Sequence, residues 1–171
     1  MSISRDELLN ILSVVSFLGH YEREMHAAEK KVLMAMFKVA SVTHEEHEKM
    51  KSNHSLDGML KQLQSDDAKH TLVELMALVA GADGVLQDEE RTIIKKIMKR
   101  VGVKDDHPYF DDDNLDVANV RANVGKILSS LKIFQPDNEL ICQQFLDTVN
   151  YLNCFFAFPY STEFVSLIFS R

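Results

Sequence analysis

An apolar helix that runs into an Asp-Gly turn and then into a second helix is the feature that most constrains this chain. It spans residues 75–103 and reads LMALVAGADGVLQDEERTIIKKIMKRVGV. Asp83 and Gly84 are expected to end the first helix, because Gly tolerates the positive φ of a helix stop and Asp competes for local backbone hydrogen bonds. Glu90 lies in the first turn of the second helix, so the carboxylates of Asp83 and Glu90 can converge. The segment predicts a helical hairpin with an acidic turn.

The composition favours a single all-α domain. A chain of 171 residues can bury a core without disulfides or a structural metal. Three prolines, six glycines, eight methionines and no tryptophan are typical of a helical protein. We therefore expect a single-domain helical bundle of about seven to eight helices.

The charge and the cysteines exclude several function classes. Lys and Arg number 19 against 26 Asp and Glu, which gives a formal net charge of −7. Nucleic-acid binding needs a cationic footprint and is not expected. Cys142 and Cys154 form neither a CxxC motif nor a Cys/His cluster, so free thiols in a reducing cytoplasm are expected.

The N-terminal apolar stretch predicts a helix and not a signal peptide or a membrane span. It follows Asp6 and Glu7 where a signal peptide has a cationic region, and no small-residue cleavage site closes it. Ser4 and Glu7 have the spacing of a capping box, which predicts a helix over residues 4–21.

Periodicity and capping residues predict the remaining elements. Residues 104–115, which read KDDHPYFDDDNL, are expected to form a loop. Further helices are expected at residues 27–40, 43–50, 56–63, 65–82, 88–101, 117–131 and 137–152.

Two helix-turn-helix units share one pattern. Overlaying Glu29 on Glu90, an offset of 61 positions (90 − 29), aligns the apolar stripes on both sides of the turn without a gap. Duplication would give two pseudo-twofold related units, whereas chance matching of amphipathic helices would give the same stripes. Both readings stay open on the pattern alone.

The second unit resembles the TerB family, the tellurite-resistance B-like domains related to the N-terminal domain of the DjlA co-chaperone. The resemblance is carried by Ala82-Asp83-Gly84, Leu86 and Asp88-Glu89-Glu90. It implies an all-helical bundle with pseudo-twofold related halves, whose acidic turns form a polar site for a divalent cation. We therefore divide the chain into a TerB-like helical domain at residues 1–152 and a C-terminal extension at residues 153–171.

The resemblance also implies which residues would bind the metal. Carried over by position, the candidates are Asp83 and Glu90 in the second half and Glu22 and Glu29 in the first. The first half departs from the pattern, because Arg23 stands where Gly is expected and places a cation beside the site. The ion would be Ca²⁺, Mg²⁺ or Zn²⁺, and its identity stays open.

A structural reading of the same carboxylates stays open beside the metal reading. Glu90 follows Gln87 by three residues, and Glu29 follows His26 by three. At this spacing a Glu side chain reaches back to cap the start of its helix and favours the helix dipole. Asp83 could likewise serve only as a turn former.

Two other polar clusters are interpreted as solvated surface. Residues 44–48 read HEEHE, and their second His comes one position too early for the helical motif of zinc proteases. Residues 111–113 and Asp116 could bind calcium weakly, but an acidic loop and helix start explain them better.

The extension at residues 153–171 reads NCFFAFPYSTEFVSLIFSR and holds five of the ten phenylalanines. Pro159 and Glu163 interrupt it, and it is too short to span a bilayer, so membrane insertion is not expected. Packing on the bundle is the preferred reading, and an exposed strip that pairs two chains is the next.

No arrangement typical of an enzyme is visible in the sequence, whether a Ser/His/Asp or Cys/His set, a phosphate-cradling loop or a pair of catalytic acids. The expected function is that of a non-enzymatic, cytoplasmic TerB-like stress-response domain of the tellurite-resistance type, binding divalent cations at its acidic turns. The alternative is a protein–protein interaction scaffold with purely structural turns, whose partner is another protein or a second copy.

Overall fold

The computed structural model describes residues 3–20, 25–51, 55–104, 107–111, 114–129 and 131. Within these ranges the chain forms eight helices and one short hairpin, which confirms the all-α class. The elements are α1 (Arg5–His20), α2 (Ala27–Val39), α3 (His44–Lys51), α4 (Leu56–Lys61), α5 (Asp66–Ala80), α6 (Asp88–Val101), β1 (Phe110–Asp111), β2 (Asn114–Leu115), α7 (Val117–Ala122) and α8 (Val124–Ser129). None of the described helices is long and apolar enough to cross a bilayer.

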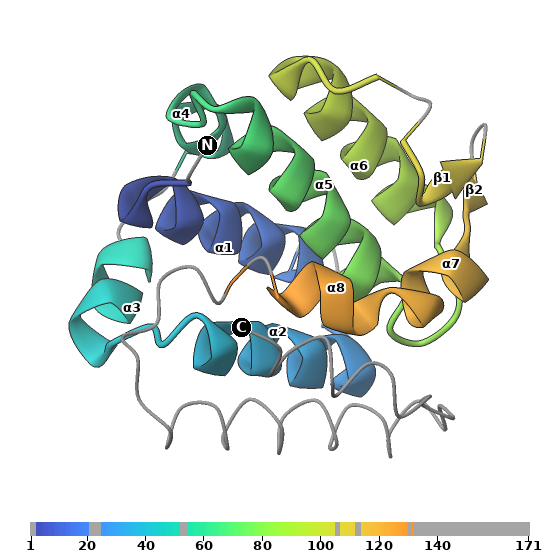
Figure 1. The fold of residues 1–171 in the computed structure, drawn as a ribbon, viewed down its shortest axis with the longest axis horizontal. Helices are drawn as coiled ribbons and strands as arrows, with labels where there is room; N and C mark the ends of the chain where they lie inside the picture. Colours follow the sequence, from blue (N-terminus) through green and yellow to red (C-terminus); the bar gives the residue numbers. More distant parts are fainter. Residues whose placement is uncertain are drawn as a thin grey trace, which may run out of the picture.

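Helix α5 is the centre of the bundle. It contacts α1, α2, α6, α7 and α8, and Figure 1 shows it crossing between α1 and α6. Apolar residues cover most of its circumference, which is typical of a helix surrounded by others. Its buried residues are Ala68, Thr71, Leu72, Val73, Leu75, Met76, Ala77, Leu78, Val79 and Ala80.

The predicted capping box forms at the start of α1, and a second capping box forms at the start of α3. Ser4 N–H donates to Glu7 Oε2 at 3.0 Å, and Glu7 N–H donates to Ser4 Oγ at 3.2 Å. Thr43 N–H donates to Glu46 Oε2 at 2.9 Å, and Glu46 N–H donates to Thr43 Oγ1 at 3.2 Å. Each box satisfies backbone donors that a helix start would otherwise leave unpaired.

Two expectations about the C-terminal half of the described chain were wrong. The loop over residues 104–115 contains an antiparallel hairpin in which Phe110 pairs with Leu115. The single helix over residues 117–131 is divided into α7 and α8 at Asn123, whose side-chain amide donates to Asn119 O at 2.9 Å. This side chain competes with the helical backbone pattern.

Several predictions concern parts that the structure does not test. The helix at residues 137–152 and the extension at residues 153–171 lie outside the described residues. The pseudo-twofold relation between the two halves stays a prediction. The two units do share a local feature, since α2 and α6 both begin with a capping box.

Candidate functional site

The turn between α5 and α6 is shaped by local backbone chemistry. Helix α5 ends at Ala80, three residues before the expected stop at Asp83. Asp83 Oδ1 accepts a hydrogen bond from Val85 N–H at 2.9 Å, which makes Asp83 a turn former. Gly84 has a φ of 88°, a left-handed conformation that glycine adopts without strain. Asp83 is partly exposed, so its carboxylate borders solvent at the turn.

Glu90 and Glu29 lie at the starts of the two helices that follow the turns. Glu90 is only 6% exposed, and its Oε2 accepts from Gln87 N–H at 3.0 Å. Glu29 is 1% exposed, and its Oε2 accepts from His26 N–H at 2.8 Å. The capping interpretation of both glutamates is confirmed, and each also places negative charge at the positive end of a helix dipole.

The structure does not assemble the predicted cation site from the residues that it describes. Glu22, the fourth candidate, lies outside them. Among the described side chains, no group of three or more His, Cys, Asp or Glu is arranged to hold a metal ion. Metal binding at Asp83, Glu90, Glu22 and Glu29 therefore stays a prediction.

Comparison with known protein families decides what this helical arrangement is. The family model for tellurite resistance protein TerB matches residues 12–108. The chain belongs to the TerB family. The match runs from within α1 to the segment after α6, so it includes the turn at Asp83 and the sequence positions of Glu22 and Glu29. No curated protein and no solved structure is significantly similar to the chain.

A groove lies over α2 and the start of α3 of the TerB domain and has a volume of about 870 Å³. Met34 projects from α2 and is 66% exposed, the largest fraction among the large hydrophobic side chains of the described residues. The Phe37 and His47 rings meet edge to face, with their centroids 5.6 Å apart, and thus join α2 to α3. The described lining residues are Lys30, Lys31, Met34, Ala35, Phe37, Lys38, Val42, Thr43, His44 and His47.

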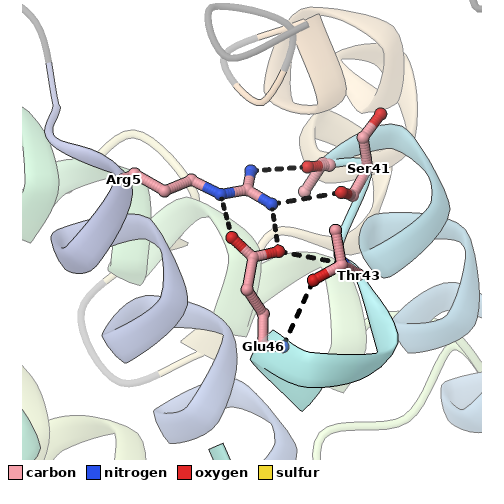
Figure 2. Close-up of polar contacts among 5 residues, drawn as sticks. Arg5, Ser41, Thr43 and Glu46 are labelled. Carbon is pink, nitrogen blue, oxygen red and sulfur yellow. Dashed lines mark hydrogen bonds and ion pairs between the residues drawn. The ribbon is translucent and has the colours of Figure 1, made fainter. Parts of the chain in front are cut away.

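Arg5 holds α3 in place beside the groove (Figure 2). Its Nη1 donates to Ala40 O at 2.7 Å and its Nη2 to Ser41 O at 3.1 Å, while Nε and Nη2 donate to the two carboxylate oxygens of Glu46 at 2.8 and 2.6 Å. The hydrogen bonds that Glu46 accepts from Arg5 and Thr43, together with the charge of Arg5, hold the pKa of Glu46 at about 2 against the opposing effect of burial. The spacing of Thr43 and Glu46 is that of a capping box, but nothing in the local sequence indicates Arg5, which is 41 positions from Glu46.

Glu7 joins the start of α1 to the link between α4 and α5. Besides capping α1, its Oε1 accepts from Gln64 N–H at 3.0 Å and from Ser65 N–H at 2.8 Å. Burial alone would raise the pKa of Glu7, but the hydrogen bonds from Ser4, Ser65 and Gln64 together outweigh it and hold the pKa at about 2. The capping-box spacing predicted one of these roles, and only the fold supplies the second.

A polar cluster at α5 brings together His70 and His107, which are 37 positions apart (107 − 70) in the chain. The rings of His70 and His107 stack with centroids 5.8 Å apart, and His107 lies 5.6 Å from the Tyr109 ring. Burial raises the pKa of the nearby Glu74 carboxyl, and burial together with the charge of Glu74 raises the pKa of Tyr109. The cluster packs the segment after α6 against α5.

Proposed function

We propose that this TerB domain is a non-enzymatic, cytoplasmic binding module of a tellurite-resistance-type stress response, and that it binds a protein segment in the groove over α2 and α3. The observation that carries the proposal is the exposed Met34 in an apolar groove. Apolar surface that is exposed on one face often marks a site of protein interaction. Methionine suits such a site because its side chain is flexible and polarizable.

The hydrogen bonding at the acidic turns supports the same proposal. Glu29 and Glu90 are buried, and each accepts a hydrogen bond from the backbone at the start of its own helix. Asp83 closes its own turn by accepting from Val85 N–H. Under this proposal the acidic turns stabilise the helix starts, and recognition takes place at the groove.

Complementation in cells tests the proposal. A strain that becomes tellurite-sensitive on loss of this gene would carry wild-type protein, Met34→Glu or Val85→Glu. Val85 is the matched control, because it is 59% exposed but does not line the groove. We expect the strain that carries Met34→Glu to lose tellurite tolerance and the strain that carries Val85→Glu to retain it. Both purified variants should unfold at the same urea concentration as the wild-type protein. A Met34→Glu protein that restores full tolerance would refute the groove as the binding surface.

A second candidate function is divalent-cation binding at the acidic turns. It is favoured by the partly exposed carboxylate of Asp83 and by the acidic first turn of α6, where Asp88 and Glu89 are exposed. Hard cations need several oxygen ligands. The described carboxylates do not form a three-ligand group, so the site would also need Glu22, backbone carbonyls or water.

Titration with metal ions separates the two candidates. Ca²⁺, Mg²⁺, Zn²⁺ and Mn²⁺ would each be added to the purified protein while its amide signals are recorded. Cation binding predicts saturable shifts centred on Asp83 and Glu90 that disappear in Asp83→Asn. If no ion shifts these signals and Asp83→Asn still restores tellurite tolerance in cells, cation binding at this turn is excluded.

A further inference from the structure

The floor of the groove is apolar and is built by α2, α3 and the link between them. Met34 and Ala35 come from α2, and Val42 comes from the link to α3. The contact between the Phe37 and His47 rings closes the junction between the helices. A groove between two packed helices suits a third helix, whose side chains fit into the spaces between those of its neighbours. The shape of the groove therefore favours a helical ligand.

Two lysines and a methionine form a row along the face of α2 that lines the groove. Lys30, Met34 and Lys38 are exposed and follow one another at intervals of four residues, so they lie on one side of the helix. Eight positions (38 − 30) separate the two lysines, which is about 12 Å along the helix axis. Lys31 is half-buried beside them, and the three lysines form the lysine rim of the groove. The row presents an apolar side chain between two positive charges.

The described carboxylates of α2 and α3 lie outside the lining of the groove. Glu29 is buried in the cap of α2, and Glu46 is held by Arg5. Glu45 and Glu48 are exposed on α3 but do not line the groove. The described lining residues thus include three lysines and no Asp or Glu. The groove is basic, although the whole chain has a formal net charge of −7.

We propose that the ligand of this groove is an acidic amphipathic helix of a partner protein. In this arrangement an apolar side chain of the partner packs on Met34, and carboxylates about four residues before and after it lie beside Lys30 and Lys38. Such charge complementarity selects the partner by excluding basic segments, since like charges that face each other weaken binding. The proposal rests on the proposed function in one respect, the groove as a protein-binding surface.

Two other occupants fit the groove less well. A second copy of the chain, docked by a symmetric contact, would place one lysine rim against the other. A bilayer of anionic lipids would attract the lysines, but its flat surface does not enter a groove of about 870 Å³ between two helices. A partner helix satisfies both the charge and the concave shape of the groove.

A pair of synthetic peptides tests the charge of the ligand. Both would carry leucines at helical spacing on one face, with glutamate at the other positions of the first peptide and lysine at those of the second. We expect the glutamate peptide to shift the amide signals of Ala35, Phe37 and Val42 saturably, and the lysine peptide to bind at least roughly tenfold more weakly. Equal or reversed affinities would overturn the proposal, and so would silence of these signals with both peptides.

Charge reversal at the lysine rim tests which residues select the ligand. The double variant Lys30→Glu, Lys38→Glu should lose the preference for the glutamate peptide. The control is Lys99→Glu, Lys104→Glu, which changes the net charge equally at two exposed lysines outside the groove and should keep the preference. If the rim variant prefers the glutamate peptide as strongly as the control does, the rim does not select the ligand and the proposal fails.

The tellurite assay in cells separates this proposal from the proposed function. We expect Met34→Glu and the rim variant both to lose tolerance, and the Lys99→Glu, Lys104→Glu control to retain it. If Met34→Glu loses tolerance while the rim variant retains it, the acidic helix is overturned and the groove stands as the binding surface. If Met34→Glu retains full tolerance, the groove itself is refuted.

Two further measurements test the other occupants. The protein should not sediment with vesicles of phosphatidylcholine and phosphatidylserine, and sedimentation that is lost in the rim variant would overturn the proposal in favour of a bilayer. The amide signals of the groove should not change with protein concentration. If they shift as the concentration rises, the proposal is overturned in favour of a second copy.

Discussion

Glu29 and Glu90 occupy equivalent places in two different helices, although 61 positions (90 − 29) separate them in the chain. Each is the third residue of its helix, is buried, and accepts a hydrogen bond from the N–H of its own N-cap residue. Helices α2 and α6 therefore begin with the same kind of capping hydrogen bond. This holds even though the flanking residues differ, His26 in one turn and Gln87 in the other.

Removing either cap should weaken the fold. We expect Glu29→Ala and Glu90→Ala each to lower the free energy of unfolding by about 1 kcal/mol, because each leaves backbone donors at a helix start unpaired. Urea denaturation would measure the change. The control is Glu45→Ala, which removes an exposed carboxylate from an i,i+4 pair with Lys49 and should cost less than about 0.5 kcal/mol. Equal losses for Glu45→Ala and Glu90→Ala would contradict the capping role.

Replacing Arg5 by lysine should loosen α3 without removing a charge. A lysine cannot reproduce the paired hydrogen bonds to Glu46, nor the additional donors to Ala40 O and Ser41 O. We expect Arg5→Lys to cost about 2 kcal/mol of unfolding free energy in urea denaturation. Amide signals of His47 in the groove should shift as well. If stability and groove signals both match those of the wild type, Arg5 does not position α3.

The low pKa values of Glu7 and Glu46 predict how stability depends on pH. Both folded pKa values are about 2, lowered from an ordinary 4.5. The unfolded state therefore binds protons first, so the stabilisation is complete above about pH 4.5 and is lost as pH falls toward about 2. Glu74 acts in the opposite direction, because burial raises its pKa and favours its protonated form in the folded state.

Urea denaturation at a series of pH values tests this dependence. We expect the double variant Glu7→Gln, Glu46→Gln to be less stable than wild type at neutral pH, and its stability to fall less steeply between about pH 4.5 and 2. Parallel curves for the two proteins through this range would show that these carboxylates do not carry the acid sensitivity.

Two glycines should respond in opposite ways to the same substitution. Gly102 caps α6 with a φ of 79°, and an added Cβ would meet no atom within 4 Å, so Gly102→Ala introduces backbone strain alone. We expect it to cost about 1 kcal/mol. Gly58 lies inside α4, where a Cβ would make an ordinary 3.5 Å contact with Ser55 Cβ, so Gly58→Ala should stabilise by about 0.5 to 1 kcal/mol. Thermal unfolding would measure both, and shifts of the same sign would contradict this account.

Features set by short-range spacing were predicted correctly from the sequence. The apolar stripes of α1, α2, α5 and α6 and the Glu caps depend on residues three or four positions apart, so periodicity alone finds them. The division at Asn123 and the hairpin at Phe110 were missed. The division depends on a side-chain hydrogen bond that competes with the helical backbone while α7 and α8 pack against α5, and the hairpin depends on two short strands that pair with each other; no spacing rule records either.

By itself the sequence determined the all-α class, the acidic turn at Asp83 and the capping-box spacing of Glu29 and Glu90, because these follow from local backbone chemistry and helical period. Only the tertiary structure decided that Arg5 meets Glu46, that Glu7 also binds the link before α5, and that Met34 lies exposed in a groove with a lysine rim. These relations join segments that are far apart in the chain. They form only when burial of the α5 core brings the surrounding helices together.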